Sequence, residues 1–147
     1  MILRGAYEKD FDQMIDVWEA SVRATHDFLT EKDILSLRKL IRSEIFYLGD
    51  IDIKVFEKGN EILGFIGTAN NNIEMLFIAP SYFGKGIGKY LLVHAIRDKK
   101  CTKVEVNEQN PRALNFYQKY GFVVKSRSEV DHQGNPFPIL YLELNNA

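Results

Sequence analysis

The chain has 147 residues, 46% of them hydrophobic, which suits a single domain over residues 1–147 with a substantial core. Its 19 Lys and Arg residues nearly balance its 20 Asp and Glu residues, for a formal charge of -1. This balance excludes a broad basic surface for nucleic acid or for an anionic membrane. The charged first ten residues are no signal sequence, and no apolar run approaches a membrane span, so we expect a cytoplasmic protein.

The first fifty residues predict a short strand followed by two amphipathic helices. Apolar side chains recur every three or four residues from 11 to 22 and again from 34 to 45. Asp10, with Gln13 three residues later, is expected to cap the first helix, and Thr30 the second. The expected elements are a strand at 2–6, a helix ending near residue 25, and a helix from 31 to the break at Gly49.

The remaining residues predict six strands and two helices. A turn at 58–61 joins the first two of these strands into a hairpin. Asn110 and Pro111 suit the start of the last helix, and Gly121 suits its end. The expected strands are 53–56, 62–66, 73–79, 103–106, 122–124 and 139–142. The order β-α-α-β-β-β-α-β-α-β-β predicts a mixed α/β fold with about seven strands and four helices.

The segment between the strand at 73–79 and the third helix is rich in glycine. Gly84, Gly86 and Gly88 alternate with other residues just before the helix begins. Without a Cβ, the backbone can turn tightly and point N–H groups at a ligand, and a helix N-terminus favours an anion such as a diphosphate. A flexible turn that only caps the helix is the structural alternative.

Two familiar glycine-rich loops do not fit this segment. Gly88-Lys89-Tyr90 lacks the Ser or Thr that holds magnesium in a P-loop. The loop also lies past the middle of the chain, after antiparallel-looking strands, whereas a dinucleotide-binding loop opens the first unit of a parallel sheet. The lone Cys101 and the scattered His26, His94 and His132 have no metal-ligand spacing, so we expect no metal site.

Two motifs resemble those of the GCN5-related N-acetyltransferase (GNAT) family. Residues 76–80, the glycine-rich loop and Leu91-Leu92 are similar to its acetyl-CoA-binding motif. Asn107, with the run from Asn110 to Phe122, is similar to its second motif. Residues 24–29 and 106–110 further resemble its bacterial YjaB-type branch. The resemblance covers nearly the whole chain and implies the GNAT fold and an enzyme that moves an acetyl group from acetyl-CoA to a primary amine.

The resemblance also implies where the cofactor binds. The strand before the loop would pair with the pantetheine arm, the N–H groups of 84–89 would hold the diphosphate, and the two parallel strands would splay apart around it. The family usually has Arg or Gln where this chain has Phe83, which leaves Lys85 and Lys89 to replace some charge. The implied cofactor residues are Leu76, Phe77, Ile78, Gly84, Lys85, Gly86, Ile87, Gly88, Lys89, Asn107, Asn110 and Tyr117.

The chemistry needs an acid for the leaving sulfur and a base for the incoming amine. The resemblance implies Tyr117 as the acid, and tyrosine with its pKa of ~10 keeps its proton at neutral pH. Its helical spacing from Leu114, taken alone, favours a core aromatic instead. Glu74, beside the reaction centre on its strand, is the expected base, although it could also face solvent and leave the proton to a water chain. His26 is the other candidate base, and its alternative is a role in packing or capping.

The acceptor amine is not identified by any motif. His26 and Phe28, in the connection between the first two helices, are the expected substrate contacts, because this connection walls the acceptor site in the family. A small molecule or a peptide could supply the amine, and the resemblance also allows a homodimer. A non-catalytic acyl-CoA-binding module with regulatory or sensor function is the alternative that keeps the fold.

Overall fold

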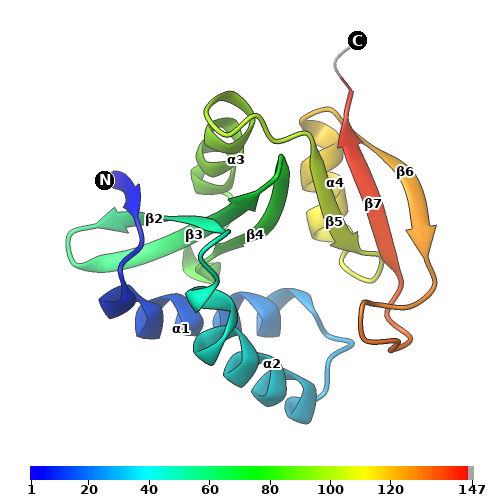
Figure 1. Ribbon diagram of the computed structural model, residues 1–147, viewed down its shortest axis with the longest axis horizontal. Coiled ribbons are helices and arrows are strands. Elements are labelled where there is room, and N and C mark those ends of the chain that lie inside the picture. Colours follow the sequence, from blue (N-terminus) through cyan, green and yellow to red (C-terminus); the bar gives the residue numbers. More distant parts are fainter. Residues whose placement is uncertain (146–147) are drawn as a thin grey trace.

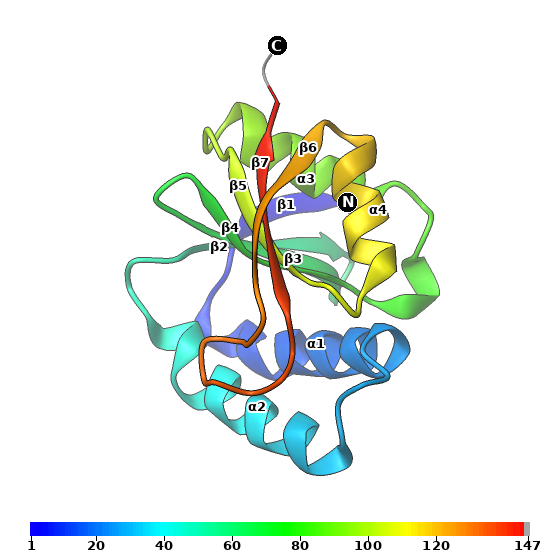
Figure 2. The ribbon, with the colours of Figure 1, turned by 90° about the vertical axis from the view of Figure 1, so that its right-hand side faces the viewer.

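The computed structural model describes residues 1–145, which form one twisted seven-stranded sheet with helices on both faces (Figure 1, Figure 2). The expected order of seven strands and four main helices is confirmed. The helices are α1 (Phe11–Thr25), α2 (Glu31–Ser43), α3 (Ile87–Arg97) and α4 (Pro111–Lys119). The strands are β1 (Ile2–Gly5), β2 (Asp52–Lys58), β3 (Glu61–Ala69), β4 (Asn72–Ile78), β5 (Lys103–Asn107), β6 (Phe122–Ser128) and β7 (Ile139–Leu144).

The centre of the sheet contains the feature that creates space for a ligand. The strand order is β1-β2-β3-β4-β5-β7-β6, and β4 and β5 are neighbours that run parallel. They pair only at Asn72 with Lys103 and at Ile73 with Val104, and then diverge (Figure 1). A β-bulge adds to the divergence: Thr68 pairs with Ile73 and Gly67 with Met75, so Glu74 is the extra residue on β4.

Two hydrophobic clusters fill the two faces of the sheet. One packs α1 and α2 against β2, β3 and β4 around Met14, Ile15 and Phe65, which are less than 2% exposed. The other packs α3 and α4 against the opposite face around Leu91 and Leu92. Because strand side chains alternate between faces, the continuous apolar run in β3 serves both clusters at once.

Local signals at two helix N-termini and one C-terminus act as the sequence predicts. Thr30 caps α2 by accepting a hydrogen bond from the Asp33 N–H at 3.1 Å. Asn110 caps α4 by accepting one from the Ala113 N–H at 3.2 Å. Gly121 follows α4 with φ +99°, the left-handed conformation that favours glycine. Helix α2 ends earlier than predicted, at Ser43, because a separate 3-10 turn (Ile45–Tyr47) follows it.

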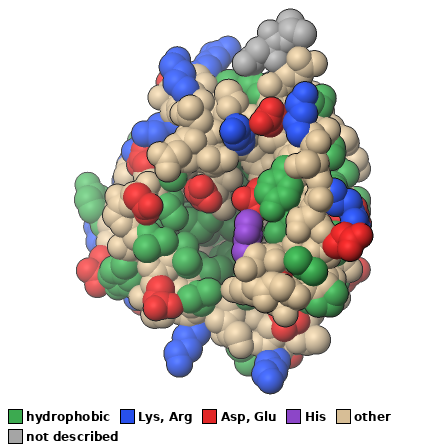
Figure 3. Space-filling model, turned by 45° about the vertical axis from the view of Figure 1, so that its right-hand side comes forward, with side chains coloured by type: hydrophobic (Ala, Val, Ile, Leu, Met, Phe, Trp, Pro, Cys, Tyr) green, Lys and Arg blue, Asp and Glu red, His purple; other side chains and the backbone are tan. Residues whose placement is uncertain are grey.

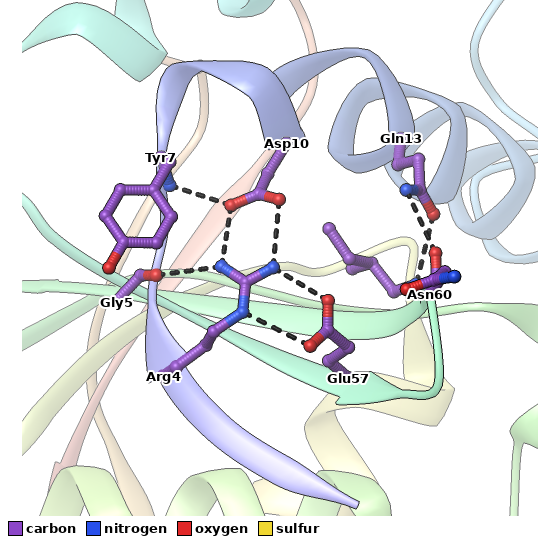
Figure 4. Close-up of polar contacts among 8 residues, drawn as sticks. Arg4, Gly5, Tyr7, Asp10, Gln13, Glu57 and Asn60 are labelled. Atoms are coloured by element: carbon purple, nitrogen blue, oxygen red, sulfur yellow. Dashed lines mark hydrogen bonds and ion pairs between the residues drawn. The ribbon is translucent and has the colours of Figure 1, made fainter.

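The predicted capping pair of Asp10 and Gln13 is wrong (Figure 4). A 3-10 turn (Glu8–Asp10) precedes α1, so the backbone of Asp10 is already helical and its side chain does not cap the helix. The buried Asp10 carboxylate instead accepts hydrogen bonds from Arg4, at 2.8 Å, and from the Tyr7 N–H, at 2.7 Å. Gln13 reaches the β2–β3 turn and accepts from the Ile62 N–H at 3.1 Å.

Candidate active site

A groove of about 650 Å³ opens where β4 and β5 diverge. It runs along the second half of β4, past the glycine-rich loop, and is closed on its other side by α4. The glycine-rich loop, the apolar strand β4 and helix α4 therefore face the same space. Its lining residues are Ser21, Thr25, His26, Leu76, Phe77, Ile78, Tyr82, Phe83, Gly84, Gly86, Gly88, Lys89, Asn110, Arg112, Ala113, Asn115, Phe116, Tyr117, Lys119 and Tyr120.

The glycine-rich loop presents bare backbone to the groove at the N-terminus of α3. Gly84 and Gly86 have φ +74° and φ +89°, and Gly86 is the N-cap residue. A Cβ built at either glycine meets no protein atom within 4 Å, because this side of each residue faces open space. No side chain caps α3, so its first-turn N–H groups and the positive end of its dipole remain for an anion. An uncapped helix N-terminus beside open space is the kind of geometry that can accommodate an anion.

Gly88, the third glycine of the loop, lies in a different environment. A Cβ there would lie 3.4 Å from the ring of Phe116, which comes from α4. This is an ordinary van der Waals distance, so Gly88 lies next to α4 and also contributes to the surface of the groove.

Cationic side chains reach the groove from both sides. Lys89 comes from α3, and Arg112 and Lys119 come from α4. The Arg112 guanidinium stacks on the ring of Phe83, 4.2 Å from its centroid. Arg112 from α4 therefore places a positive charge beside Phe83, where the family usually has Arg or Gln. The aromatic ring helps to hold the guanidinium in place.

Tyr117 lies in the wall of the groove with its ring enclosed. It is 6% exposed, and its ring packs edge-on against Phe116 and Phe122, with centroids 5.2 and 5.6 Å away. Burial raises the pKa of the Tyr117 hydroxyl above its ordinary value, so the group stays protonated at neutral pH. Within residues 1–145 the hydroxyl has no hydrogen-bond partner, which leaves its proton free for a group in the groove.

A second cavity of about 320 Å³ adjoins the groove, because His26 and Phe77 line both. It lies between α1, α2 and the loop that joins β6 to β7. The ring of Phe28 contacts His26 on one side and Phe137 on the other, with centroid distances of 5.4 and 5.2 Å. This aromatic row joins the α1–α2 connection to the β6–β7 loop and forms one wall of the cavity.

The structure brings most of the sequence-predicted site residues together, but divides them between the two cavities. Lys85 and Ile87 do not line the groove: Lys85 lies over the ring of Tyr82, and the Ile87 side chain is in the core. Asn107 and Phe28 line the second cavity. The groove-lining members are His26, Leu76, Phe77, Ile78, Gly84, Gly86, Gly88, Lys89, Asn110 and Tyr117.

Glu74, the predicted base, lines neither cavity. It is exposed at the bulge of β4. Partial burial, together with the negative charges of Glu105 and Asp50, raises the pKa of its carboxyl. Glu74 is therefore a stronger base than an ordinary glutamate, but its place is at the surface beside the site.

Sequence reasoning missed several groove residues, of which Arg112 is the most informative. Arg112 follows the Asn110-Pro111 signal that opens α4, and an Arg in the first turn of a helix beside the loop could have indicated an anion contact. Ser21 and Thr25 were missed because only the packing of α1 brings them to the groove. Among residues 1–145, no group of His, Cys, Asp and Glu could hold a metal ion, and no helix is long and apolar enough to cross a membrane.

Comparison with known proteins finds relatives and solved structures that are named as N-acetyltransferases. The peptidyl-lysine N-acetyltransferase YjaB of Salmonella typhimurium is 37% identical over 95% of each chain, and that of Escherichia coli K12 is 36% identical over 95% of this chain and 94% of its own. The solution structure of apo-form YjaB from Escherichia coli superposes with a TM-score of 0.87 at 34% identity and covers both chains fully. PaiA N-acetyltransferase from Thermoplasma acidophilum, in complex with coenzyme A, shares the fold with a TM-score of 0.76 at 24% identity, covering 97% and 98%.

The family model described as the acetyltransferase (GNAT) domain matches residues 28–138, which include the glycine-rich loop and most of the residues that line the groove and the second cavity. This match and the identity to YjaB over nearly the whole chain agree with the splayed strands and the loop geometry. The chain therefore belongs to the GNAT family of acetyltransferases, enzymes that use acetyl-CoA.

Proposed function

We propose that this enzyme transfers an acetyl group from acetyl-CoA to the side-chain amine of lysine in a peptide or protein. The observation that carries the proposal is the junction of the two cavities at His26 and Phe77, with Tyr117 in the wall of the groove. One cavity has the features of a cofactor site, and the adjoining cavity offers space for an acceptor. Relatives named peptidyl-lysine N-acetyltransferases support lysine as the acceptor.

The residues present fit coenzyme A. The N–H groups around Gly86 and the N-terminus of α3 would hold the diphosphate, since the glycines leave open space there. Lys89, Arg112 and Lys119 would balance the phosphate charge. The edge of β4 from Leu76 to Ile78, freed by the divergence from β5, offers backbone groups to the pantetheine arm.

Acetyl-CoA supplies a thioester carbonyl that an unprotonated amine can attack directly. Tyr117 acts as the general acid and gives its proton to the sulfur as the thiolate leaves. The buried hydroxyl keeps its proton at neutral pH and lies in the wall of the groove, so the proton is present when the thiolate leaves. Glu74 and His26 are the two groups that could take the proton of the incoming ammonium. Comparing the pH dependence of kcat in variants at the two positions would show which of them is the base.

Two measurements test the proposal. Calorimetric titration should give saturable binding of acetyl-CoA and of CoA. Release of free CoA thiol should then require a lysine-containing peptide, and mass spectrometry should find an added acetyl group on the lysine. Binding without turnover on any amine would instead identify a non-catalytic acyl-CoA-binding module, and no binding would overturn the cofactor site.

A further inference from the structure

Strand β6 lies at one edge of the sheet, so no strand of residues 1–145 covers its outer side (Figure 1). A bulge at Lys125 interrupts its first half, and from Ser126 to Ser128 it pairs regularly with β7. Residues 124–127 are exposed. A free edge offers backbone N–H and C=O groups to another strand, and proteins either protect such an edge or use it for pairing.

The residues along this edge are arranged symmetrically about Arg127. Outward from Arg127 in both directions come two serines, then Lys125 and Glu129, then Val124 and Val130. When two copies of one strand pair antiparallel about a twofold axis, residues at equal distances from the axis lie opposite each other. An axis at Arg127 therefore places Lys125 of each copy opposite Glu129 of the other, and valine opposite valine.

Neighbouring registers do not give this match. An axis at Ser126 would place Lys125 opposite Arg127, two positive charges. An axis at Ser128 would place Lys125 opposite Asp131, whose carboxylate already accepts hydrogen bonds from two N–H groups of its own loop at 2.9 and 2.8 Å. The pattern of side chains thus selects the axis at Arg127.

The two arginines that would meet at this axis each have an anionic partner of their own. Nε and Nη2 of Arg127 donate to the carboxylate of Glu108 at 2.6 and 3.0 Å. Two parallel hydrogen bonds neutralise the guanidinium and fix its orientation. The centre of the pairing therefore carries no net charge, and attraction comes from the Lys125 and Glu129 pairs on either side of it.

Both ends of the symmetric segment carry exposed apolar side chains. Val124 is 43% exposed and Val130 is 44% exposed, so each valine would be covered by the other copy. The chain bends after Ser128, whose Oγ donates to the Val130 carbonyl oxygen at 2.7 Å. The backbone ladder is therefore short, and residues 129 and 130 would contribute side-chain contacts alone. A contact of this size gives a weak dimer.

The surface around β6 has charges of both signs. On the face in Figure 3, apolar side chains gather in a hollow to the left of the middle, whereas toward the right-hand margin, where β6 lies, basic and acidic side chains stand next to each other. A partner of mixed charge fits such a surface better than an apolar partner. A second copy of this chain supplies the same charges in the reverse order.

We propose that the edge of β6 from Val124 to Val130 is a self-association surface, which pairs antiparallel with the same segment of a second copy about a twofold axis at Arg127. The two sheets then continue into one another. None of residues 124–130 lines the groove or the second cavity, so the pairing occupies no residue of either site. Self-association of this kind is independent of the proposed function.

Charge reversal at the two ends of the segment tests both the surface and its register. Sedimentation equilibrium of the whole chain from about 10 µM to about 1 mM should show a monomer–dimer equilibrium. Lys125→Glu alone and Glu129→Lys alone should each weaken the dimer about tenfold or more, because two opposite-charge pairs become like-charge pairs. An equimolar mixture of the two variants should restore the dimer, because each copy then meets the opposite charge at both ends.

Lys58→Glu is the matched control, because it makes the same change of net charge at an exposed residue of β2, near the other end of the sheet. Its dimer should be as stable as that of the original protein. A monomer over the whole concentration range would mean that the bulge and Lys125 only protect the edge, and the proposal would be wrong. Failure of the mixture to restore the dimer would also overturn it, and restoration shows that both variants are folded.

Amide NMR provides a readout of where the copies meet. As the protein concentration rises, the amide resonances of Ser126, Arg127 and Ser128 should shift and their hydrogen exchange should slow. In Lys125→Glu the same resonances should keep their monomer positions at equal concentration. The amides of β1, at the opposite edge of the sheet, should not respond. Shifts at β1 and none at β6 would overturn the proposal even if a dimer forms.

Discussion

Tyr117 has the two properties that an acid for a thiolate needs, a retained proton and a place in the groove. Tyr117→Phe removes the proton and keeps the ring that packs on Phe116 and Phe122. We expect kcat to fall about 10²-fold or more, with unchanged affinity for acetyl-CoA by calorimetry. Unchanged turnover would remove Tyr117 from the mechanism. Because its pKa is raised, ionisation of Tyr117 should cause no loss of kcat up to about pH 10.

The position of the Arg112 guanidinium depends on its contact with the ring of Phe83. The guanidinium stacks 4.2 Å above the ring and lines the groove beside the glycine-rich loop. Arg112→Ala should weaken CoA binding by about tenfold or more, since a charge-assisted hydrogen bond is worth about 1.5–3 kcal/mol. The matched control is Arg97→Ala, which removes an exposed positive charge at the far end of α3. Equal affinities in the two variants, measured by calorimetry at low and high salt, would show that Arg112 does not contact the cofactor.

Gly86 separates the conformational role of glycine from its role in ligand binding. Gly86→Ala introduces a Cβ at φ +89° that faces the open groove, so it should both strain the backbone and obstruct the diphosphate. Gly59→Ala is the control, because Gly59 has φ +62° and open space in the β2–β3 turn. Both variants should lose about 1 kcal/mol of unfolding free energy, but only Gly86→Ala should lose CoA affinity. Normal CoA binding by Gly86→Ala would disprove the loop geometry.

At the scale of the elements, the contacts around Arg4 fix β1 to β2 and to the start of α1 (Figure 4). Arg4 binds Asp10 and Glu57, each at 2.8 Å, and Asp10 is 4% exposed. Asp10→Asn should lower the free energy of unfolding by about 2 kcal/mol, because Arg4 loses its most buried anionic partner. Glu108→Gln, which breaks the exposed pair with Arg127, should lower the free energy of unfolding by less than about 1 kcal/mol. Urea titration measures the free energy of unfolding of both variants.

The same contacts predict how stability depends on pH. The hydrogen bond from Arg4 is the main cause that lowers the pKa of the Asp10 carboxyl in the folded protein. Its stabilisation is therefore complete above the unfolded pKa of ~3.9 and is lost as pH falls through the lower folded value. The free energy of unfolding should decrease below about pH 4, and less steeply in Asp10→Asn. Equal slopes for both proteins in urea titrations at pH 2–5 would show that Asp10 does not contribute.

For the whole molecule, the divergence of β4 and β5 divides the sheet into two parts joined by only two residue pairs. The groove lies across this division, with the loop and α3 contributed after β4 and α4 after β5. A ligand in the groove should therefore hold both parts together. Acetyl-CoA at 100 times its Kd should raise the free energy of unfolding by about 2.7 kcal/mol, and hydrogen exchange should slow in both α3 and α4. Slowing confined to α3 would show that α4 does not bind the cofactor.

The sequence by itself determined the elements and the family. Hydrophobic periodicity, the caps at Thr30 and Asn110, and Gly121 after α4 identified the helices, because these signals act within one or two turns of chain. Glycine spacing before α3 also predicted the tight turn of the loop, since backbone geometry there is a local property. The whole strand order could be expected only from the resemblance to a known fold.

Tertiary structure alone decided which side chains share a cavity. Asp10 lost its expected capping role to Arg4, because a partner from another element outweighed the local signal. Arg112 reached the groove beside the glycine-rich loop only through the packing of α4, and Asn107 and Asn110 line different cavities because Asn107 ends β5 whereas Asn110 caps α4. Such contacts join residues far apart in sequence, and their distances depend on how the elements pack, which periodicity and local motifs do not contain.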